Sequence, residues 1–305
     1  MLGWAMSRGG AGGRIARVPE SVPEVVSILD LERLELDLYR GAQPSRSTLQ
    51  RVFGGQVAAQ ALMAACRSVE DERPVHSLHA YFLRGGDTSV PIVYDVERIR
   101  DGTSFSTRRV SARQHGTVIF YLTASFQRPE AGFEHQDEMP DVPSAEDCPD
   151  LAEVLERVST RAADSWRREW SALIVHYAGD SRPGGTIAAH GRPARQRLWF
   201  RTNGDLPDDP VLHTCLLTYA SDLTLLGSSL VPHGMLIGEP GLQAASLDHA
   251  VWFHRPVHAD RWLLYDQVSP AAVSGRGFAQ ARIFTESGEL VASVAQEGLI
   301  RRTRR

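Results

Sequence analysis

The sequence predicts an α+β fold built from two tandem repeats, each a long helix wrapped by an antiparallel sheet. Two observations lead to this fold class. Short segments of the first half recur in the second half, and in each half a helical pattern is followed by stretches with the two-residue period of strands.

Three pairs of similar segments carry the repeat. Ser77–Arg84 resembles Ser246–Arg255, Val93–Val96 resembles Leu264–Val268, and Gly102–Phe105 resembles Gly275–Phe278. All three pairs are separated by about 170 residues, which favours an internal duplication over chance matches.

The elements follow the same order in both halves. Apolar residues with helical spacing predict helices near 54–68 and 211–226, with a short strand before each, at Leu34–Tyr39 and Arg195–Arg201. After each helix the period changes to two and predicts further strands at Val90–Arg98, Ser104–Ala112, Val118–Gln127, Trp262–Val268, Arg276–Thr285 and Glu289–Leu299. We expect the two sheets to join edge to edge, because long free edges invite aggregation.

These elements suggest four regions in the 305-residue chain. Residues 1–26 are expected to be a flexible extension, 27–130 the first repeat and 191–302 the second. Residues 131–190 are expected to be a linker, because an acidic, proline-containing stretch is followed by an amphipathic pattern that predicts one helix over Leu151–Trp170.

Composition narrows the function classes. The net charge of -4 argues against a general nucleic-acid binder. No apolar run reaches the roughly 20 residues of a membrane span, and the N-terminal apolar patch is too short for a secretory signal. Three scattered cysteines without metal-ligand spacing fit a reduced compartment, so we expect a cytoplasmic protein.

Three polar residues lie where apolar residues are expected. Asp222 lies in a helix that is apolar on most faces, and a buried carboxylate is costly unless it is hydrogen-bonded or functional; otherwise it marks a polar face or a helix end. Gln296 shares the buried face of the last strand by alternation, unless it is a hydrated strand end. Ser246 begins a strand predicted at Ser246–His254, where a serine is often only a turn residue.

Other chemistries find weaker support. Asp248 and His249 are adjacent on a strand and should point to opposite faces, so they cannot form a dyad without distortion. The sequence has no Gly-x-Ser-x-Gly elbow and no Walker loop. His76 with His79 and His254 with His258 are weak metal-ligand pairs, and we expect no metal site.

Basic residues of the first repeat could hold a nucleotide phosphate, or could simply form a solvated strand face. They are Arg98, Arg100, Arg108, Arg109 and Arg113, of which Arg98, Arg108 and Arg109 are the candidate substrate-binding residues.

Several motifs together resemble the acyl-CoA thioesterase II family, the TesB type with a double hotdog fold, over residues 27–302. They are Val52–Gln56, His76–Arg84, Arg100–Val110, Ala220–Asp222, Ser246–His249, Trp252–Pro256 and Gln296–Gly298. Three departures are a serine at position 246, where the family often has threonine, the absence of the usual proline after Arg84, and a glycine-rich N-terminal extension.

The resemblance implies hydrolysis of a fatty acyl-CoA by a water bound to Asp222, Ser246 and Gln296, with backbone N–H groups near the second helix as oxyanion donors. It also makes Gly55 and Gln56 candidate substrate-binding residues, and it implies a homo-oligomer without metal or organic cofactor. Two alternatives remain open: a non-catalytic acyl-CoA-binding protein, and a hydratase or dehydratase.

Overall fold

The computed structural model describes residues 21–44, 49, 51–70, 72–182, 184–187 and 194–303. The first half contains α1 (Val22–Leu29), β1 (Glu32–Glu35), β2 (Leu38–Gly41), α2 (Gly54–Cys66), β3 (Val75–Phe82), β4 (Ile92–Asp101), β5 (Phe105–Gln114) and β6 (Thr117–Gln127). The rest contains α3 (Leu151–Glu156), α4 (Thr160–Glu169), β7 (Leu173–Asp180), β8 (Ala194–Thr202), α5 (Pro210–Ser221), the 3-10 helix η1 (Leu225–His233), β9 (Leu242–Ser246), β10 (Asp248–Phe253), β11 (Leu263–Val273), β12 (Arg276–Thr285) and β13 (Leu290–Arg302).

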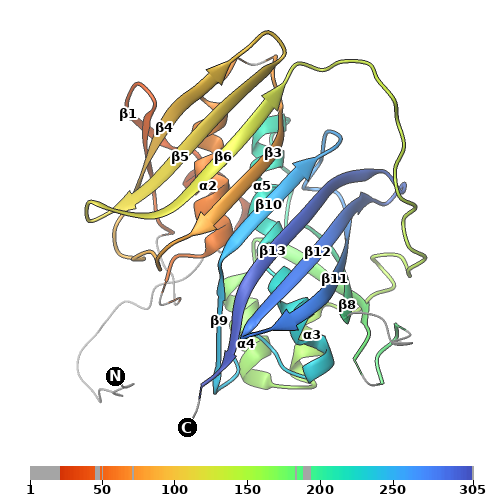
Figure 1. Cartoon of the computed structure of the whole chain (residues 1–305). Coiled ribbons are helices and arrows are strands. Elements are labelled where there is room, and N and C mark those ends of the chain that lie inside the picture. Colours follow the sequence, from red (N-terminus) through yellow and green to blue (C-terminus); the bar gives the residue numbers. More distant parts are fainter. Residues whose placement is uncertain are drawn as a thin grey trace.

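All thirteen strands of the described residues belong to one antiparallel sheet (Figure 1). The order is β1-β2-β4-β5-β6-β3-β10-β13-β12-β11-β8-β7, and β9 pairs with β13. From the centre outward, the first half runs β3-β6-β5-β4 and the second runs β10-β13-β12-β11, so the repeated order predicted from the sequence is confirmed. The two halves meet where β3 pairs with β10, with His79 opposite Ala250, and the expected edge-to-edge joining is therefore also confirmed.

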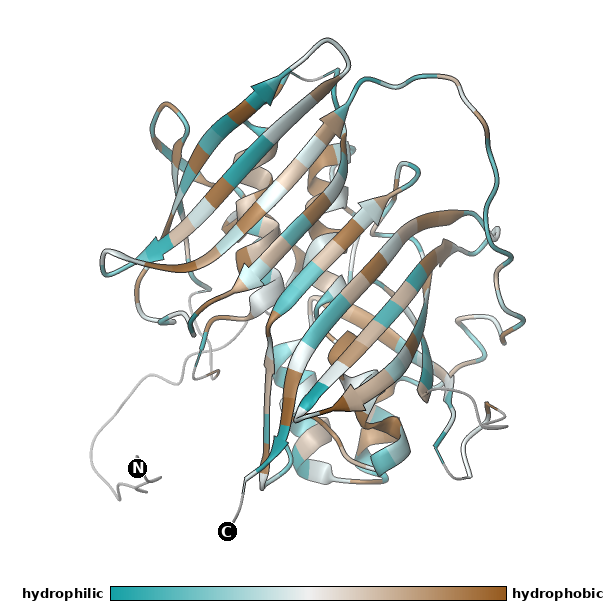
Figure 2. Ribbon diagram, viewed as in Figure 1, coloured by the Kyte–Doolittle hydropathy of each residue, from teal (hydrophilic) through white to brown (hydrophobic). Residues whose placement is uncertain are grey.

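Two helices fill the concave side of this sheet. Both α2 and α5 are buried on nearly all faces, and they pack against each other. Alanines dominate α2, and their small side chains let neighbouring backbone approach closely. Figure 2 shows hydrophilic and hydrophobic residues alternating along the long strands, as expected for a sheet with one face on the core and one in solvent.

The segment Pro210–His233, which contains α5 and η1, is long and apolar enough to cross a membrane by length and composition alone. However, 78% of its most apolar window is buried inside the protein, as in the core helix of a water-soluble fold.

The described N-terminal elements differ from the prediction. The expected flexible extension 1–26 includes the start of α1, whose N-cap Ser21 accepts a hydrogen bond from the Glu24 amide. Residues 1–20 of that extension lie outside the described residues. The single strand expected at Leu34–Tyr39 is a hairpin of β1 and β2, because the chain turns at Asp37, whose φ is 58°.

Four further corrections concern the second half. The single helix expected at Leu151–Trp170 is two helices, because Ser159 caps a new helix. The expected linker 131–190 contains β7, which pairs with β8. The helix expected near 211–226 ends at Ser221 and gives way to η1. The strand expected over Ser246–His254 is interrupted at Leu247, which separates β9 from β10.

Candidate active site

Asp222 lies at the carboxyl end of α5. It is the C-cap residue, with α-helical dihedral angles, and it is 8% exposed. The chain tightens here, because the amides of Leu223 and Gly227 donate to carbonyls three residues earlier. The carboxylate therefore lies in the core at the change from an α-helix to a 3-10 helix.

The structure brings the three predicted side chains together. The Ser246 hydroxyl donates to Asp222 Oδ1 over 3.0 Å, and Gln296 Nε2 donates both to the same oxygen and, over 3.0 Å, to Ser246 Oγ. The three groups thus form a closed triangle of hydrogen bonds. Their catalytic role remains a prediction, but the geometry that it requires is present.

Strand pairing places Ser246 and Gln296 on the helix-facing side of the sheet. Gln296 lies in the middle of β13 and is 0% exposed, as the alternation of its strand predicts. Ser246 ends β9 opposite Gly298, and the Leu247 amide donates to the carbonyl of Glu297. The break at Leu247 lets the chain leave β9 and enter β10, where it pairs with the first half.

The first half contributes the amino end of α2. The Gly55 amide donates to the Asp222 carboxylate, and the N-cap residue Phe53 provides no side-chain cap. A Cβ at Gly54 would lie 2.6 Å from Asp222 Oδ2, and one at Gly55 would lie 2.4 Å from the Tyr219 carbonyl oxygen. Only glycine allows this approach, so the carboxylate meets the positive end of a helix from the opposite half.

The expectation of oxyanion donors near the second helix stays a prediction. The backbone amide beside the carboxyl end of that helix belongs to Gly55 of α2, and it donates to Asp222. A helix leaves its first amides without intrahelical partners, and the amino end of α2 lies against the carboxyl end of α5. The two consecutive glycines before a helical pattern were the available signal.

Burial raises the pKa of Asp222 to about 6, and hydrogen bonds from Gln296, Ser246 and the Gly55 amide oppose the rise. A carboxyl with this pKa is mostly ionised at neutral pH but is more basic than an exposed aspartate. Such a group suits general-base catalysis near pH 7.

Gln296 also presents an acceptor with no partner among the described residues. Its Oε1 is buried and receives no hydrogen bond from them. Buried amide oxygens are normally satisfied by protein groups or water. The same side chain that donates to Asp222 and Ser246 can therefore accept a hydrogen bond from a small donor at this site.

His249 supports the carboxyl end of α5 from β10. Its Nε2 lies 2.8 Å from Ser221 Oγ; because that hydroxyl donates to the Thr218 carbonyl, Nε2 is the donor. Burial lowers the pKa of His249 to about 4, so the ring is neutral. Asp248 instead accepts the Glu297 amide at 2.6 Å, so the two residues do not form a dyad, as expected.

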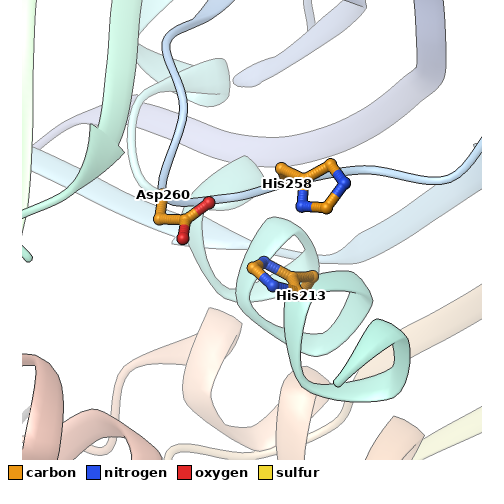
Figure 3. A group of neighbouring side chains, drawn as sticks. All are labelled: His213, His258 and Asp260. Atoms are coloured by element: carbon orange, nitrogen blue, oxygen red, sulfur yellow. The ribbon is translucent and has the colours of Figure 1, made fainter. Parts of the chain in front are cut away.

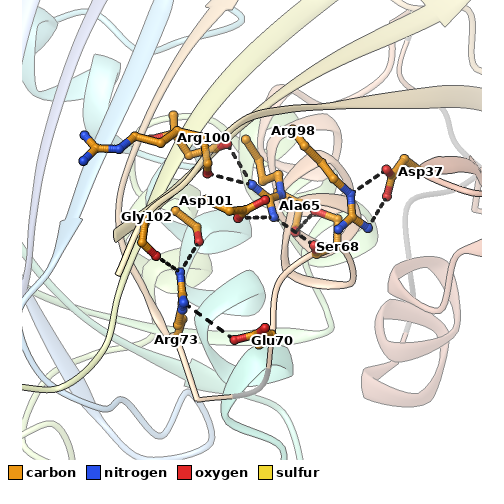
Figure 4. Close-up of polar contacts among 12 residues, drawn as sticks. Asp37, Ala65, Ser68, Glu70, Arg73, Arg98, Arg100, Asp101 and Gly102 are labelled. Carbon is orange, nitrogen blue, oxygen red and sulfur yellow. Dashed lines mark hydrogen bonds and ion pairs between the residues drawn. The ribbon is translucent and has the colours of Figure 1, made fainter. Parts of the chain in front are cut away.

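The predicted substrate-binding arginines separate onto two faces of the sheet. Arg98 and Arg108 are cross-strand neighbours on the helix-facing side, whereas the next residue, Arg109, points to the outer face and pairs there with Glu97. Arg98 forms a two-pronged ion pair with Asp37 (Figure 4).

The burial of Arg108 fits neither alternative considered from the sequence, an exposed phosphate-binding residue or part of a solvated strand face. Arg108 is 1% exposed, and it donates to Asp101, to the hydroxyl and carbonyl of Ser68, and to two strand carbonyls. Strand alternation turns Arg108 inward, where these bonds brace the end of α2. In this structure the guanidinium of Arg108 therefore stabilises the fold.

Gln56, the other predicted substrate-binding residue, is buried beside Gly55. Its Nε2 donates to Gln43 Oε1 over 3.1 Å. The two histidine pairs that were weak metal-ligand candidates have other contacts. His76 lies 2.8 Å from Ser125 Oγ, His79 packs against Trp252, and His254 lies 2.9 Å from Ser293 Oγ.

Comparisons with known proteins agree with this architecture. A model of the acyl-CoA thioesterase N-terminal domain matches residues 43–127, and a model of acyl-CoA thioesterase matches residues 175–299. Acyl-CoA thioesterase 2 of Haemophilus influenzae is 40% identical over 277 residues, which cover 91% of this chain and 96% of that protein.

Two solved structures are similar over almost the whole chain. Acyl-CoA thioesterase II TesB2 of Mycobacterium marinum has a TM-score of 0.77 and 48% identity, and the alignment covers 92% of this chain and 98% of the other. A hotdog-fold protein of unknown function from Alicyclobacillus acidocaldarius has a TM-score of 0.71 at 19% identity, covering 92% and 98%, and supports the fold alone. This chain therefore has a double hotdog fold and belongs to the acyl-CoA thioesterase II family.

Proposed function

We propose that this protein hydrolyses acyl-CoA to a free fatty acid and CoA by direct attack of a water held by Asp222, Ser246 and Gln296. The observation that carries the proposal is the buried triangle of these side chains against the glycine-containing amino end of α2. Membership in a family of acyl-CoA thioesterases gives the substrate class.

The proton of the attacking water goes to Asp222. Its raised pKa, about 6, makes it basic enough to accept that proton while it stays mostly ionised at pH 7. The free acceptor of Gln296, Oε1, takes the second hydrogen of the water, and Ser246 holds Asp222 in place. Water therefore reaches the thioester carbon with both hydrogens engaged.

The amino end of α2 stabilises the developing oxyanion. Helix amino ends present backbone N–H groups and a partial positive charge, which favour negative charge nearby. Gly54 and Gly55 let this end pack directly against Asp222 and the Tyr219 carbonyl, which brings the first N–H groups of α2 to the proposed site. The site thus combines groups from both halves of the chain.

No acyl-enzyme is expected on Ser246. Its hydroxyl donates to Asp222, and the nearest candidate base in sequence, His249, is bonded instead to Ser221 and has a pKa of about 4. A serine nucleophile is activated by an adjacent base, and the only base bonded to Ser246 among the described residues is Asp222, which is assigned to the attacking water. The intermediate is therefore the tetrahedral adduct of water, which collapses with expulsion of the CoA thiolate.

Thiol release from a panel of short to long acyl-CoAs tests the function. Asp222→Asn should lower kcat by on the order of 10²-fold or more, Gln296→Ala by less, and Ser246→Ala by least, with little change in CoA affinity. Glu297→Gln is the matched control, because Glu297 neighbours Gln296 but pairs with Arg276 on the outside.

Three outcomes would contradict parts of this proposal. Acyl-CoA binding without thiol release would indicate a non-catalytic binding protein. Hydration or dehydration of an enoyl or hydroxyacyl thioester that depends on His249 would indicate the hydratase class. An acyl group trapped on Ser246 during turnover, seen by mass spectrometry, would refute direct water attack.

A further inference from the structure

Away from the candidate active site, two histidines and a carboxylate come together at the amino end of α5 (Figure 3). His213 lies in the first turns of α5, while His258 and Asp260 lie on the segment between β10 and β11. One ligand atom of each residue lies within 4.8 Å of the other two. Two parts of the chain about 45 residues apart thus present nitrogen and oxygen ligands to one point.

Asp260 provides an independent sign that a cation belongs there. Its Oδ1 is buried and receives no hydrogen bond from any described residue, while its Oδ2 accepts the Leu206 amide over a long 3.3 Å. A buried carboxylate oxygen without a donor is destabilising and is normally satisfied by a protein group, water or an ion.

The two histidines are suited to metal binding in different ways. His213 is buried, and its Nδ1 accepts the amide of Ala259, which directs that lone pair toward the segment carrying the other two groups. His258 is exposed, so its ring can turn and the point of convergence can be reached from solvent. Further carboxylates, Asp208 and Asp209, act electrostatically on His213 and make the surroundings favourable to a cation.

We propose that His213, His258 and Asp260 bind one divalent transition-metal ion of the zinc class. Two imidazoles and one carboxylate are ligands typical of Zn²⁺, whereas Mg²⁺ and Ca²⁺ prefer all-oxygen sites. Metal–ligand bonds of about 2.0–2.2 Å place the ligand atoms of a tetrahedral site roughly 3.4 Å apart. The ligand atoms here are separated by up to 4.8 Å, so the exposed His258 must turn inward when the ion binds. When the ion binds Nδ1 of His213, the Ala259 amide loses that acceptor and must donate to a water molecule instead, and water also completes the coordination.

The site is structural and separate from the proposed chemistry. His213 lies at the amino end of α5, and Asp222 lies at the opposite end of the same helix. A bound ion ties the segment between β10 and β11 to that helix. Because the ion binds the folded state, it should raise the unfolding temperature increasingly as the zinc concentration exceeds the dissociation constant.

The test uses the full-length chain without a histidine tag, treated with EDTA and desalted. Calorimetric titration with zinc chloride should show one equivalent bound with micromolar or tighter affinity, and zinc should raise the unfolding temperature. Cobalt chloride should give visible absorption as intense as that of tetrahedrally coordinated cobalt ions. None of these measurements depends on thioesterase activity, so a failure here leaves the proposed function untouched.

Variants decide where the ion binds. His258→Ala and Asp260→Asn should each weaken zinc binding at least tenfold and abolish the thermal shift. His233→Ala is the control, because this exposed histidine lies outside the cluster, and it should bind zinc as wild type does. His258 is exposed and the described residues give it no hydrogen bond through its side chain, so its variant should fold normally, which circular dichroism checks.

Two results would overturn the proposal. One is that the wild-type protein binds no zinc even when the zinc concentration is raised about 100-fold above the micromolar range. The other is binding that survives unchanged in both His258→Ala and Asp260→Asn, because the ion would then occupy a different place.

Discussion

Replacing Asp222 by asparagine should lower activity and at the same time stabilise the fold. Burial raises the pKa of this carboxyl from 3.8 to about 6, so the folded protein holds the proton more tightly than the unfolded chain. The charged form is therefore disfavoured in the folded state. This penalty is absent below about pH 4, grows between the two pKa values, and is complete above about pH 6.

The size of the effect follows from the shift. At about 1.4 kcal/mol per pKa unit, the ionised carboxylate destabilises the fold by about 3 kcal/mol at pH 8 and by roughly half of that at pH 5. Asparagine keeps an acceptor for Gln296, but its amide nitrogen faces the Gly55 N–H, so two donors meet. The lost hydrogen bond reduces the gain in stability by about 1–2 kcal/mol. The net gain should be about 1–2 kcal/mol at pH 8 and close to zero at pH 5.

Urea unfolding of wild type and Asp222→Asn at pH 8 and pH 5 measures this difference. The gain at pH 8 should appear as a higher midpoint and as a rise of a few degrees in unfolding temperature. Glu297→Gln, which changes a partly exposed carboxylate that pairs with Arg276 one residue from Gln296, should show no such dependence. If the difference between variant and wild type is equal at both pH values, or larger at pH 5, burial does not disfavour the charge and the reasoning is refuted.

Three further predictions concern the site and its support. The kcat/KM of the wild type should fall about tenfold per pH unit below pH 6 as Asp222 gains a proton, and a rate that stays flat down to pH 4.5 would exclude this base. Gly54→Ala should lose most thioesterase activity, because the new Cβ would lie 2.6 Å from Asp222 Oδ2, whereas Gly132→Ala meets nothing within 4 Å and should behave as wild type in the same thiol-release assay. Arg108→Met should lower the free energy of unfolding by about 3 kcal/mol or more, since it leaves buried acceptors unpaired. Arg109→Met breaks only an exposed pair and should change the free energy of unfolding by less than about 1 kcal/mol. Equal urea midpoints for the two variants would contradict the structural role of Arg108.

Much of the fold could be predicted because periodicity reports burial directly. The long strands and the two central helices follow from it, and so does the inward direction of Gln296. The elements that were missed depend on local backbone detail. The hairpin of β1 and β2 requires a left-handed residue at Asp37, and the two helices between the halves depend on one cap at Ser159.

The candidate site was predictable in part for a similar reason. Asp222 and Gln296 stand out as polar residues on apolar faces, whereas Ser246 was noted as the start of a strand and received its role from the resemblance. Gly55 was named as a substrate-binding candidate, but its hydrogen bond to Asp222 was not predictable, because it depends on how a helix of one half packs on a helix of the other. The cluster of His213, His258 and Asp260 likewise arises from a tertiary contact that sequence spacing does not encode. Arg108 is different: the alternation of its strand already indicated that Arg108 and Arg109 point in opposite directions.

The antiparallel packing of α2 and α5 creates two places where one central helix starts and the other ends. At the first, Asp222 faces Gly55. At the second, Arg67, the C-cap residue of α2, donates through its guanidinium to the Leu31 carbonyl and to Asp30. The two ends of the helix pair therefore differ in chemistry: one holds a buried carboxylate against the start of a helix, and the other holds an arginine that ties α2 to the segment after α1.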